Sequence, residues 1–190
     1  MVLDHAFALA SRVGFEGLTI GTLAEGVGMS KSGLFAHFRS KEQLQLEVLE
    51  TAIDRFVRSV LQPALRVPRG EPRVRAFFHN WLEWGRGHLA EAGGCVFIAA
   101  ANEFDDRTGV IRDRLVETQS EWLAGLAHAA QLGIDEGHFR ADLDTEQFAY
   151  EFYSIILIFH HFSRLLRDER AAERAELQFE RLIANSKPLT

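Results

Sequence analysis

Apolar residues recur every three or four positions along nearly the whole chain, and no stretch of strand length alternates apolar with polar residues. Because this spacing gathers apolar side chains on one side of a helix, it predicts an all-α fold. The first helix is expected over residues 2–14. Thr19 and Ser30 are placed to cap the two short helices that follow. Ser40, with Gln43 three positions on, starts a long helix in a capping-box pattern.

Prolines and glycines interrupt this periodicity over residues 63–72. We therefore expect a small N-terminal domain over residues 1–50 and a larger helical domain over residues 51–190. Together they hold about nine helices. Beyond the interruption, the helices are expected over residues 72–90, 94–104, 108–133, 144–167 and 169–185.

Hydrophobic residues make up 47% of the 190 residues and charged residues 25%, as in ordinary soluble globular proteins. The longest uncharged apolar stretch, Phe152–Phe162, is too short for the roughly 20 residues that cross a bilayer. The N-terminus lacks the pattern of a secretory signal. We expect a cytoplasmic protein without a membrane partner. The single cysteine, Cys95, allows neither an internal disulfide nor a multi-cysteine zinc site.

Sequence patterns of common catalytic sites are absent. No glutamate stands three positions before any of the eight histidines, as a di-metal helical bundle would require. The chain also contains no His-Glu-x-x-His, Gly-x-Ser-x-Gly or Walker motif. We therefore expect no catalytic residues, no metal site and no cofactor.

The distribution of charge points to a local basic surface on an acidic protein. The net charge of −6 by itself argues against a nucleic acid partner. No acidic residue lies between Glu25 and Glu42, however, whereas Lys31, Arg39 and Lys41 all do. A short basic stretch of this kind suits a small surface that contacts DNA phosphates.

Two short helices joined by Gly26-Val27-Gly28-Met29 fit a helix-turn-helix, because glycine permits the tight turn between them. Small residues on the second helix allow its backbone to approach the floor of a DNA major groove. Lys31, Ser32 and His37 are then placed to reach phosphates or base edges. Lys41, in the first turn of the next helix, is placed to meet a phosphate.

The segments Gly14–Ile20 and Gly28–Leu44 resemble the TetR family of transcriptional regulators. In order, they carry a Gly-Phe turn, a Thr cap, a Ser-Lys start, a Leu-aromatic-x-x-Phe pattern and a Ser-Lys-Glu helix start. The resemblance implies a DNA-binding domain over residues 1–50 and a ligand-binding and dimerisation domain over residues 51–190. It further implies a homodimeric repressor that binds palindromic operator DNA and is released by a small-molecule effector.

The DNA-binding residues that this resemblance suggests are Thr19, Ser30, Lys31, Ser32, Gly33, Phe35, His37 and Lys41. Phe35 stands where the family usually has tyrosine, so no hydroxyl is present there to contact a phosphate. We interpret Leu34, Phe35 and Phe38 as core residues that hold the reading helix. Because no basic segment precedes the first helix and residues 1–50 carry a net charge of −2, we expect modest DNA affinity with a shallow salt dependence.

Aromatic residues are dense after the proline-rich segment. Helical aromatic stripes usually form core, but several of these rings can instead line an apolar cavity with a few polar contacts. The expected effector is then small and largely apolar or aromatic. The candidate ligand contacts are Phe78, Trp81, Phe97, Asn102, Phe104, Trp122, Phe152, Tyr153 and His160.

The run Ile155–Phe159 is apolar on every side of a helix, so it needs partners on more than one side. A second copy of the chain can cover one side, with the last helix completing a four-helix interface, whereas burial within one chain is the alternative. The candidate interface residues are Ile155, Ile158, Phe159, Phe162, Ala175, Phe179 and Leu182.

A second class of function remains open at this point. An all-α module that binds a protein partner or a ligand, and never DNA, also fits a helical chain with an acidic N-terminal domain. The ordered helix-turn-helix pattern favours the DNA-binding regulator over this alternative.

Overall fold

The computed structural model describes residues 2–86 and 93–188, and within these ranges it contains helices and no strand. The predicted all-α fold is confirmed. The described residues form two compact units, one of residues up to 57 with 85–118 and the other of residues 58–84 with 119 onward. The expected end of a helix at residue 90 lies outside the described residues.

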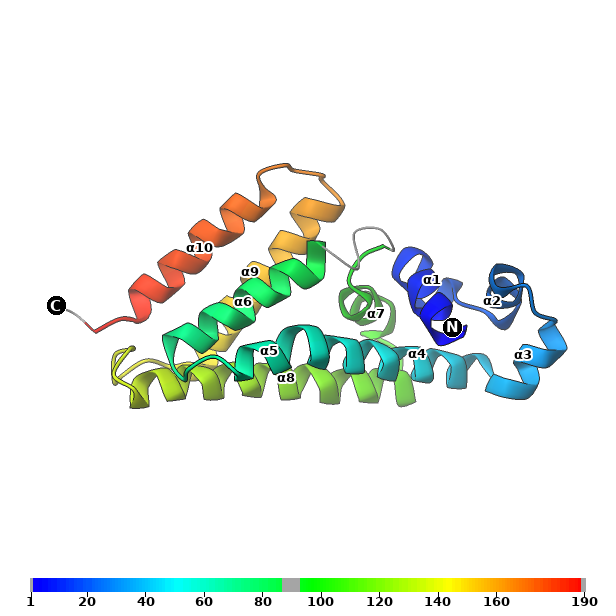
Figure 1. Cartoon of the computed structure of the whole chain (residues 1–190), viewed down its shortest axis with the longest axis horizontal. Coiled ribbons are helices and arrows are strands. Elements are labelled where there is room, and N and C mark those ends of the chain that lie inside the picture. The colour runs from blue at the N-terminus through cyan, green and yellow to red at the C-terminus, as the bar shows by residue number, and fades with distance from the viewer. Residues whose placement is uncertain (1, 87–92, 189–190) are drawn as a thin grey trace. The chain divides into compact units, whose positions relative to one another are not determined.

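The first unit combines the N-terminal helices with a helix from the middle of the chain. Figure 1 shows α7 beside α1, and these two helices are in contact. This unit is not the same as the expected domain of residues 1–50, because it also includes residues 85–118. The domain boundary near residue 50 therefore stays a prediction. Its helices are α1 (Val2–Gly17), α2 (Ile20–Val27), α3 (Lys31–Phe38), α4 (Lys41–Phe56), α7 (Val96–Phe104) and the first part of α8 (Val110–Asp135).

Side-chain caps start the short helices where the sequence suggests. Thr19 Oγ1 accepts a hydrogen bond from the Thr22 amide at 3.0 Å, and Thr22 Oγ1 in turn accepts one from the Thr19 amide, which makes a full capping box. Ser30 caps α3. Ser40 caps α4, but the Gln43 side chain donates to Glu47 Oε1 instead of returning to Ser40. The capping box expected at Ser40 is therefore only half formed.

The core of the first unit is made by one apolar side of each helix. α2 contributes Leu23, and α3 contributes Leu34 and Phe38, all without exposed surface. Phe15 at the end of α1 is also fully buried and meets Phe104 of α7 edge-on, with ring centroids 6.3 Å apart. α3 is therefore packed against the unit by one side only, and its other sides are exposed to solvent.

The helix that begins at Lys41 continues further than the sequence suggests. Pro63 was expected to begin a break, yet α4 runs through a π-helical turn (Val57–Leu61) into α5 (Gln62–Leu65) before the chain leaves the helix. A proline inside an α-helix collides with the carbonyl four residues earlier, and the wider π turn just before Pro63 relieves that contact. Counting this run as one, the described residues contain nine helices.

The second unit is a helical bundle with an aromatic centre. Besides the π turn from residue 58 and α5, it contains α6 (Glu71–Arg86) up to Trp84, the rest of α8, α9 (Thr145–Arg164) and α10 (Ala171–Ser186). α9 and α10 lie side by side in Figure 1 and, among the described helices, make the most extensive pair. Phe78 stacks on Phe179 with centroids 3.9 Å apart, and Phe152 meets both rings edge-on.

No helix in the described part of the chain is both long and apolar enough to span a bilayer.

Candidate nucleic-acid interface and ligand groove

The helix α3 presents most of its surface to solvent. Leu34 and Phe38 are its only buried residues, and the other six positions of this eight-residue helix are exposed. The exposed side carries small residues at Ser32, Gly33 and Ala36, so a rod-shaped partner can approach the backbone closely. An exposed, small-residue side of a second helix in a helix-turn-helix fits the dimensions of a major groove.

The polar groups of α3 are arranged at its N-terminal end. Ser30 Oγ accepts from the Gly33 amide at 3.1 Å and lies 3.2 Å from Ser32 Oγ. Lys31 extends past α2, where a Cβ at Gly21 would lie 3.5 Å from its Nζ. No salt bridge of Lys31 occurs among the described residues. Its ammonium group is therefore available to a phosphate.

Phe35 corrects the sequence interpretation. We expected it in the core with Leu34 and Phe38, but 58% of its surface is exposed whereas the other two have none. Phe35 lies on the flank of α3 because it follows Leu34 by 100° of helical turn, which carries it past the edge of the buried side. An exposed phenyl ring beside a polar reading surface is available for contact with sugar or base atoms.

Besides Ser30 and Ser32, two more of the suggested DNA contacts already make hydrogen bonds within the unit. The Thr19 hydroxyl belongs to the capping box of α2. Lys41 Nζ donates to the Glu16 carbonyl oxygen at 2.8 Å and lies 3.4 Å from a carboxylate oxygen of the same residue. His37 is exposed on α3, with its ring edge-on to Phe38. Direct DNA contacts by these residues remain predictions.

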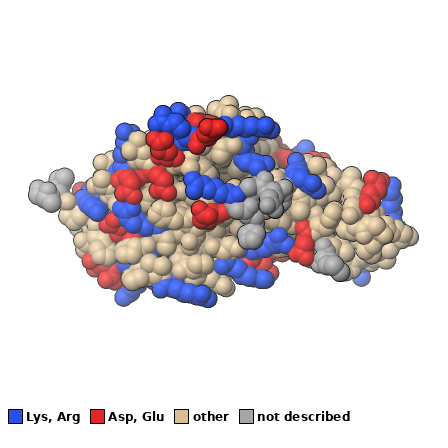
Figure 2. Space-filling view, turned by 45° about the horizontal axis from the view of Figure 1, so that its top comes forward, with Lys and Arg blue, Asp and Glu red and all other residues tan. Residues whose placement is uncertain are grey.

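Lysine and arginine side chains are interspersed with aspartate and glutamate over the face shown in Figure 2, so that face carries no broad single-sign surface. The absence of acidic residues between Glu25 and Glu42 is local to the helix-turn-helix. Attraction to DNA therefore has to come from this short segment rather than from the protein as a whole.

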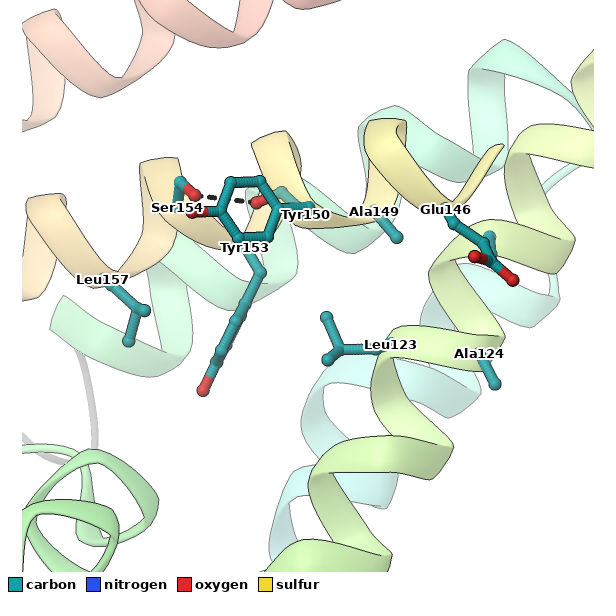
Figure 3. A pocket seen from close by; sticks show the side chains of 9 residues that line it. Leu123, Ala124, Glu146, Ala149, Tyr150, Tyr153, Ser154 and Leu157 are labelled. Atoms are coloured by element: carbon teal, nitrogen blue, oxygen red, sulfur yellow. Dashed lines mark hydrogen bonds between the residues drawn. The ribbon is translucent and has the colours of Figure 1, made fainter. Parts of the chain in front are cut away.

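In the second unit, a groove of about 710 Å³ lies between α8 and α9. Figure 3 shows Tyr153 directed from α9 into the space that faces Leu123 on α8. Small alanines on both helices leave the space open, and the lining is mostly apolar. The lining residues are Leu123, Ala124, Ala127, Glu146, Ala149, Tyr150, Tyr153, Ser154 and Leu157.

The polar groups of the groove are few and mostly paired. The Tyr153 hydroxyl and Gln119 Oε1 are 2.9 Å apart in a hydrogen bond that the hydroxyl donates. Ser154 Oγ donates to the Tyr150 carbonyl at 2.8 Å. The Glu146 carboxylate, in the first turn of α9, provides the one acidic group of the lining. A groove of this kind suits a ligand with a large apolar part.

Most of the expected ligand contacts form core instead of lining this groove. Phe78, Trp81 and Phe152 are buried in the second unit, where Trp122 meets Phe77 edge-on at 5.8 Å. Of the candidate residues in the α8–α9 region, Tyr153 alone lines the groove. Of the other four candidates, Phe97, Asn102 and Phe104 belong to the first unit, and His160 lies on α9 in the second. The ligand roles of the whole set remain predictions.

Several groove residues escaped the sequence analysis. Ala124 and Ala127 on α8 and Tyr150 and Leu157 on α9 line the groove but were not predicted as ligand contacts. The sequence signal that could have indicated the groove is the pair of alanines three residues apart on α8, because small side chains leave space beside an apolar helix. His160 lies outside the lining; burial, followed by the nearby Arg164 and His161, lowers the pKa of its imidazole.

The expected interface residues on α9 and α10 differ in their exposure to solvent. Ile158 is 51% exposed and Phe162 is partly exposed, and both line a shallow depression with Ile155 and Ala175. Phe179, by contrast, is fully buried inside its own unit. Phe159 and Leu182 are nearly buried as well. The predicted interface residues await a test, and Ile158 and Phe162 are the ones most accessible to a partner.

Both parts of the chain match family models of known proteins. Residues 2–48 match the model for bacterial regulatory proteins of the tetR family, and residues 70–179 match the model for a tetracyclin repressor-like C-terminal domain. The chain is 26% identical over 145 residues to the HTH-type transcriptional repressor KstR2 of Mycobacterium tuberculosis, covering 76% of this chain and 70% of that protein.

Solved structures share the fold. A TetR transcriptional regulator from Chloroflexus aurantiacus superposes with a TM-score of 0.80 at 24% identity, covering 96% of this chain and 90% of that one. AibR, in a complex with isovaleryl coenzyme A and operator DNA, superposes with a TM-score of 0.77 at 23% identity, covering 96% of each chain. With its exposed α3 and both family matches, this chain belongs to the TetR family of DNA-binding transcriptional regulators.

Proposed function

We propose that the chain is a homodimeric repressor that reads operator DNA with α3 and leaves it when an effector occupies the α8–α9 groove. The observation that carries the proposal is the exposed side of α3, with small residues along it and Lys31 at its start. This surface has the shape and charge that a major groove requires. The function involves no catalytic step and is exercised in the cytoplasm, where the DNA is.

The surface of α9 and α10 supports assembly into a dimer. Two-fold symmetry requires one patch that can pack on a copy of itself. The depression around Ile158 and Phe162 takes apolar residues from both helices, and a mostly polar depression that shares Ile155 and Gln178 with it lies beside it. Packing two such helix pairs gives a four-helix bundle. The two α3 helices then need a separation of about 34 Å to meet successive major grooves.

The groove between α8 and α9 supports an effector with a long apolar portion. Its volume of about 710 Å³ is within the range of small-molecule sites. The Glu146 carboxylate near one end favours a neutral or cationic group there over an anionic one. AibR shares this fold and binds isovaleryl coenzyme A, in which a short apolar acyl group is joined to a large polar carrier. Here, an apolar segment of an effector would occupy the groove.

The DNA-binding part of the proposal is tested by selection from a random pool of duplexes. The chain should enrich a palindromic site, and the double variant Lys31→Ala, Ser32→Ala should lose that enrichment. A matched double variant in the other unit, Arg140→Ala with Ser59→Ala, also removes one positive charge and one serine hydroxyl and should keep the enrichment. Enrichment of no sequence by the unaltered protein would refute the proposed function.

The effector part is tested by filling the groove. Ala127→Trp places an indole in the space between α8 and α9 without adding charge. If the groove is the effector site, a small molecule that releases the unaltered protein from its selected DNA should fail to release this variant. Ala8→Trp on α1, a half-buried alanine in the other unit, serves as the control for a bulky substitution. Equal release of the Ala127→Trp variant would assign the effector to another place.

A further inference from the structure

The helix α1 is kinked one turn before its end. Gly14 has φ 75° and ψ 175°, a conformation that is essentially restricted to glycine. The kink separates residues 2–13, which form the body of α1, from the short segment that leads through Leu18 into α2. The direction in which the helix-turn-helix leaves α1 is therefore set at Gly14.

A carboxylate from α7 occupies the space beside this glycine. A Cβ at Gly14 would lie 1.8 Å from Glu103 Oε1, so no other residue type fits while Glu103 is in place. The second oxygen of the same carboxylate accepts a hydrogen bond from the Glu16 amide at 2.9 Å. Glu103 thus caps the segment that follows the kink, although it is 87 residues away in the sequence.

Glu16 is the point at which several elements of the first unit meet. Arg107, just after α7, lies 2.7 Å from one Glu16 carboxylate oxygen. Lys41, the first residue of α4, donates to the Glu16 carbonyl at 2.8 Å. Together with the Glu103 contact, these bonds tie the junction of α1 and α2 to both α4 and α7.

The other end of α7 is attached to the same helix. The Gly94 amide donates to the Ser11 carbonyl at 2.8 Å. A Cβ at Gly93 would lie 2.0 Å from that carbonyl oxygen, so the backbones approach closely there. α7 is consequently held to α1 on both sides of the segment that ends at the kink, which gives Glu103 a fixed position relative to Gly14.

We propose that Glu103 is a positioning residue for DNA reading: its carboxylate holds the kink at Gly14 and so fixes the direction of α2 and α3. This inference rests on the proposed function, because it concerns the same reading surface. Glu103 bears a negative charge in a unit that binds a polyanion, so electrostatics alone makes it unfavourable. Its removal should strengthen DNA binding if charge is all that it contributes, and weaken sequence-specific binding if it positions the reading helix.

The test compares Glu103→Gln with Glu103→Met. Both variants lose the same charge and keep a side chain of similar length, but only glutamine offers an oxygen to the Glu16 amide. Affinity is measured for a duplex selected by the unaltered protein and for a scrambled duplex. We expect Glu103→Met to bind the selected duplex up to about tenfold more weakly than Glu103→Gln, since this factor is the upper end of what one hydrogen bond to a backbone amide contributes.

The scrambled duplex separates positioning from loss of folded protein. Misfolding reduces binding to both duplexes, whereas a misdirected α3 reduces binding to the selected duplex alone. Equal affinities of the two variants for the selected duplex, or equal losses on both duplexes, would overturn the proposal. Glu169→Gln, an exposed residue of the other unit, gives the effect of losing one negative charge elsewhere.

Amide hydrogen exchange at Glu16 tests the contact without DNA. We expect this amide to exchange faster in Glu103→Met than in Glu103→Gln, and equal rates would remove the structural basis of the proposal. If the unaltered protein selects no DNA sequence, the proposed function fails and the positioning role fails with it. If it selects DNA and the two variants then bind alike, the positioning role alone fails.

Discussion

Phe35 and Phe38 lie three residues apart on α3, yet Phe38 is fully buried and Phe35 has 58% of its surface exposed. Phe38 helps to hold α3 on the first unit, where Leu34 accompanies it on the buried side. Phe35 adds little to that core and stands beside the polar residues of the reading surface. The two phenylalanines therefore have separate roles in stability and in DNA contact.

Substitution of each phenylalanine by alanine should separate these roles. Phe38→Ala should lower the free energy of unfolding by about 3–5 kcal/mol, because it leaves a cavity in the core. Phe35→Ala should change it by less than about 0.5 kcal/mol but weaken binding to a selected duplex. Urea unfolding and fluorescence anisotropy with labelled DNA measure the two effects. A Phe35→Ala variant that binds the duplex as tightly as the unaltered protein would show that the ring makes no DNA contact.

The proposed dimer interface makes a prediction about Ile158. Ile158→Glu places a charge in the lining of the depression on α9 and α10, where a partner would desolvate it, so the variant should sediment as a monomer. Val116→Glu is a matched control, because Val116 is 50% exposed and lies on α8 within the first unit. It should leave the assembly unchanged. Dimers of the Ile158→Glu variant would place the interface elsewhere.

Two glycines with positive φ should differ in their tolerance of alanine. At Gly28, which ends α2 with φ 68°, no atom lies within 4 Å of a built Cβ, so Gly28→Ala should cost only the backbone strain of about 1–2 kcal/mol. Gly14→Ala should cost more, because φ 75° with ψ 175° is a conformation essentially restricted to glycine and the new Cβ also displaces the Glu103 carboxylate. Thermal unfolding compares the two. The expectation fails if Gly14→Ala proves the less destabilising change.

Acid should weaken the second unit through two carboxylates that contact Arg75. The hydrogen bond from Arg75 lowers the pKa of Glu180 below its ordinary 4.5. At Glu71 burial acts in the opposite direction, but hydrogen bonds from Arg75 and Lys187 outweigh it, and the pKa is lowered as well. A carboxyl group whose pKa is lower in the folded than in the unfolded state stabilises the fold at pH values above the unfolded-state pKa. This stabilisation is lost as the pH falls through the folded-state pKa.

Arg75→Gln should therefore reduce stability near neutral pH, and its difference from the unaltered protein should shrink as the pH falls below about 4.5. Urea unfolding at pH 7, 5, 4 and 3 gives the comparison. Arg66→Gln, which removes an exposed arginine of the same unit with no ion pair among the described residues, is the control. A difference that stays constant across these pH values would mean that the Arg75 contacts carry no net electrostatic stabilisation.

The sequence predicted those parts of the fold that depend on neighbouring residues. Thr19 and Ser30 cap their helices as expected, because a side-chain oxygen reaches an amide only three residues away. Gly28 ends α2 for a similarly local reason. Pro63 was the local failure, since the π turn that accommodates it has no clear sequence signature.

The parts that the sequence did not predict depend on which distant residues meet. The contact of Glu103 with Gly14 joins residues from different helices, and no spacing rule relates them. The aromatic residues of the second unit indicated a core, but the position of the remaining space depends on how the rings pack. Phe78 and Trp81 fill the centre, whereas Ala124 and Ala127 leave the groove.

The salt dependence of binding to a selected duplex, measured for the unaltered protein and for Lys31→Ala, tests DNA reading by α3 most directly. Loss of one phosphate contact should weaken binding at low salt and reduce the slope of log affinity against log salt by about 0.9 per α3 helix engaged. The same affinity and the same slope for both proteins would contradict a DNA-reading role for this surface.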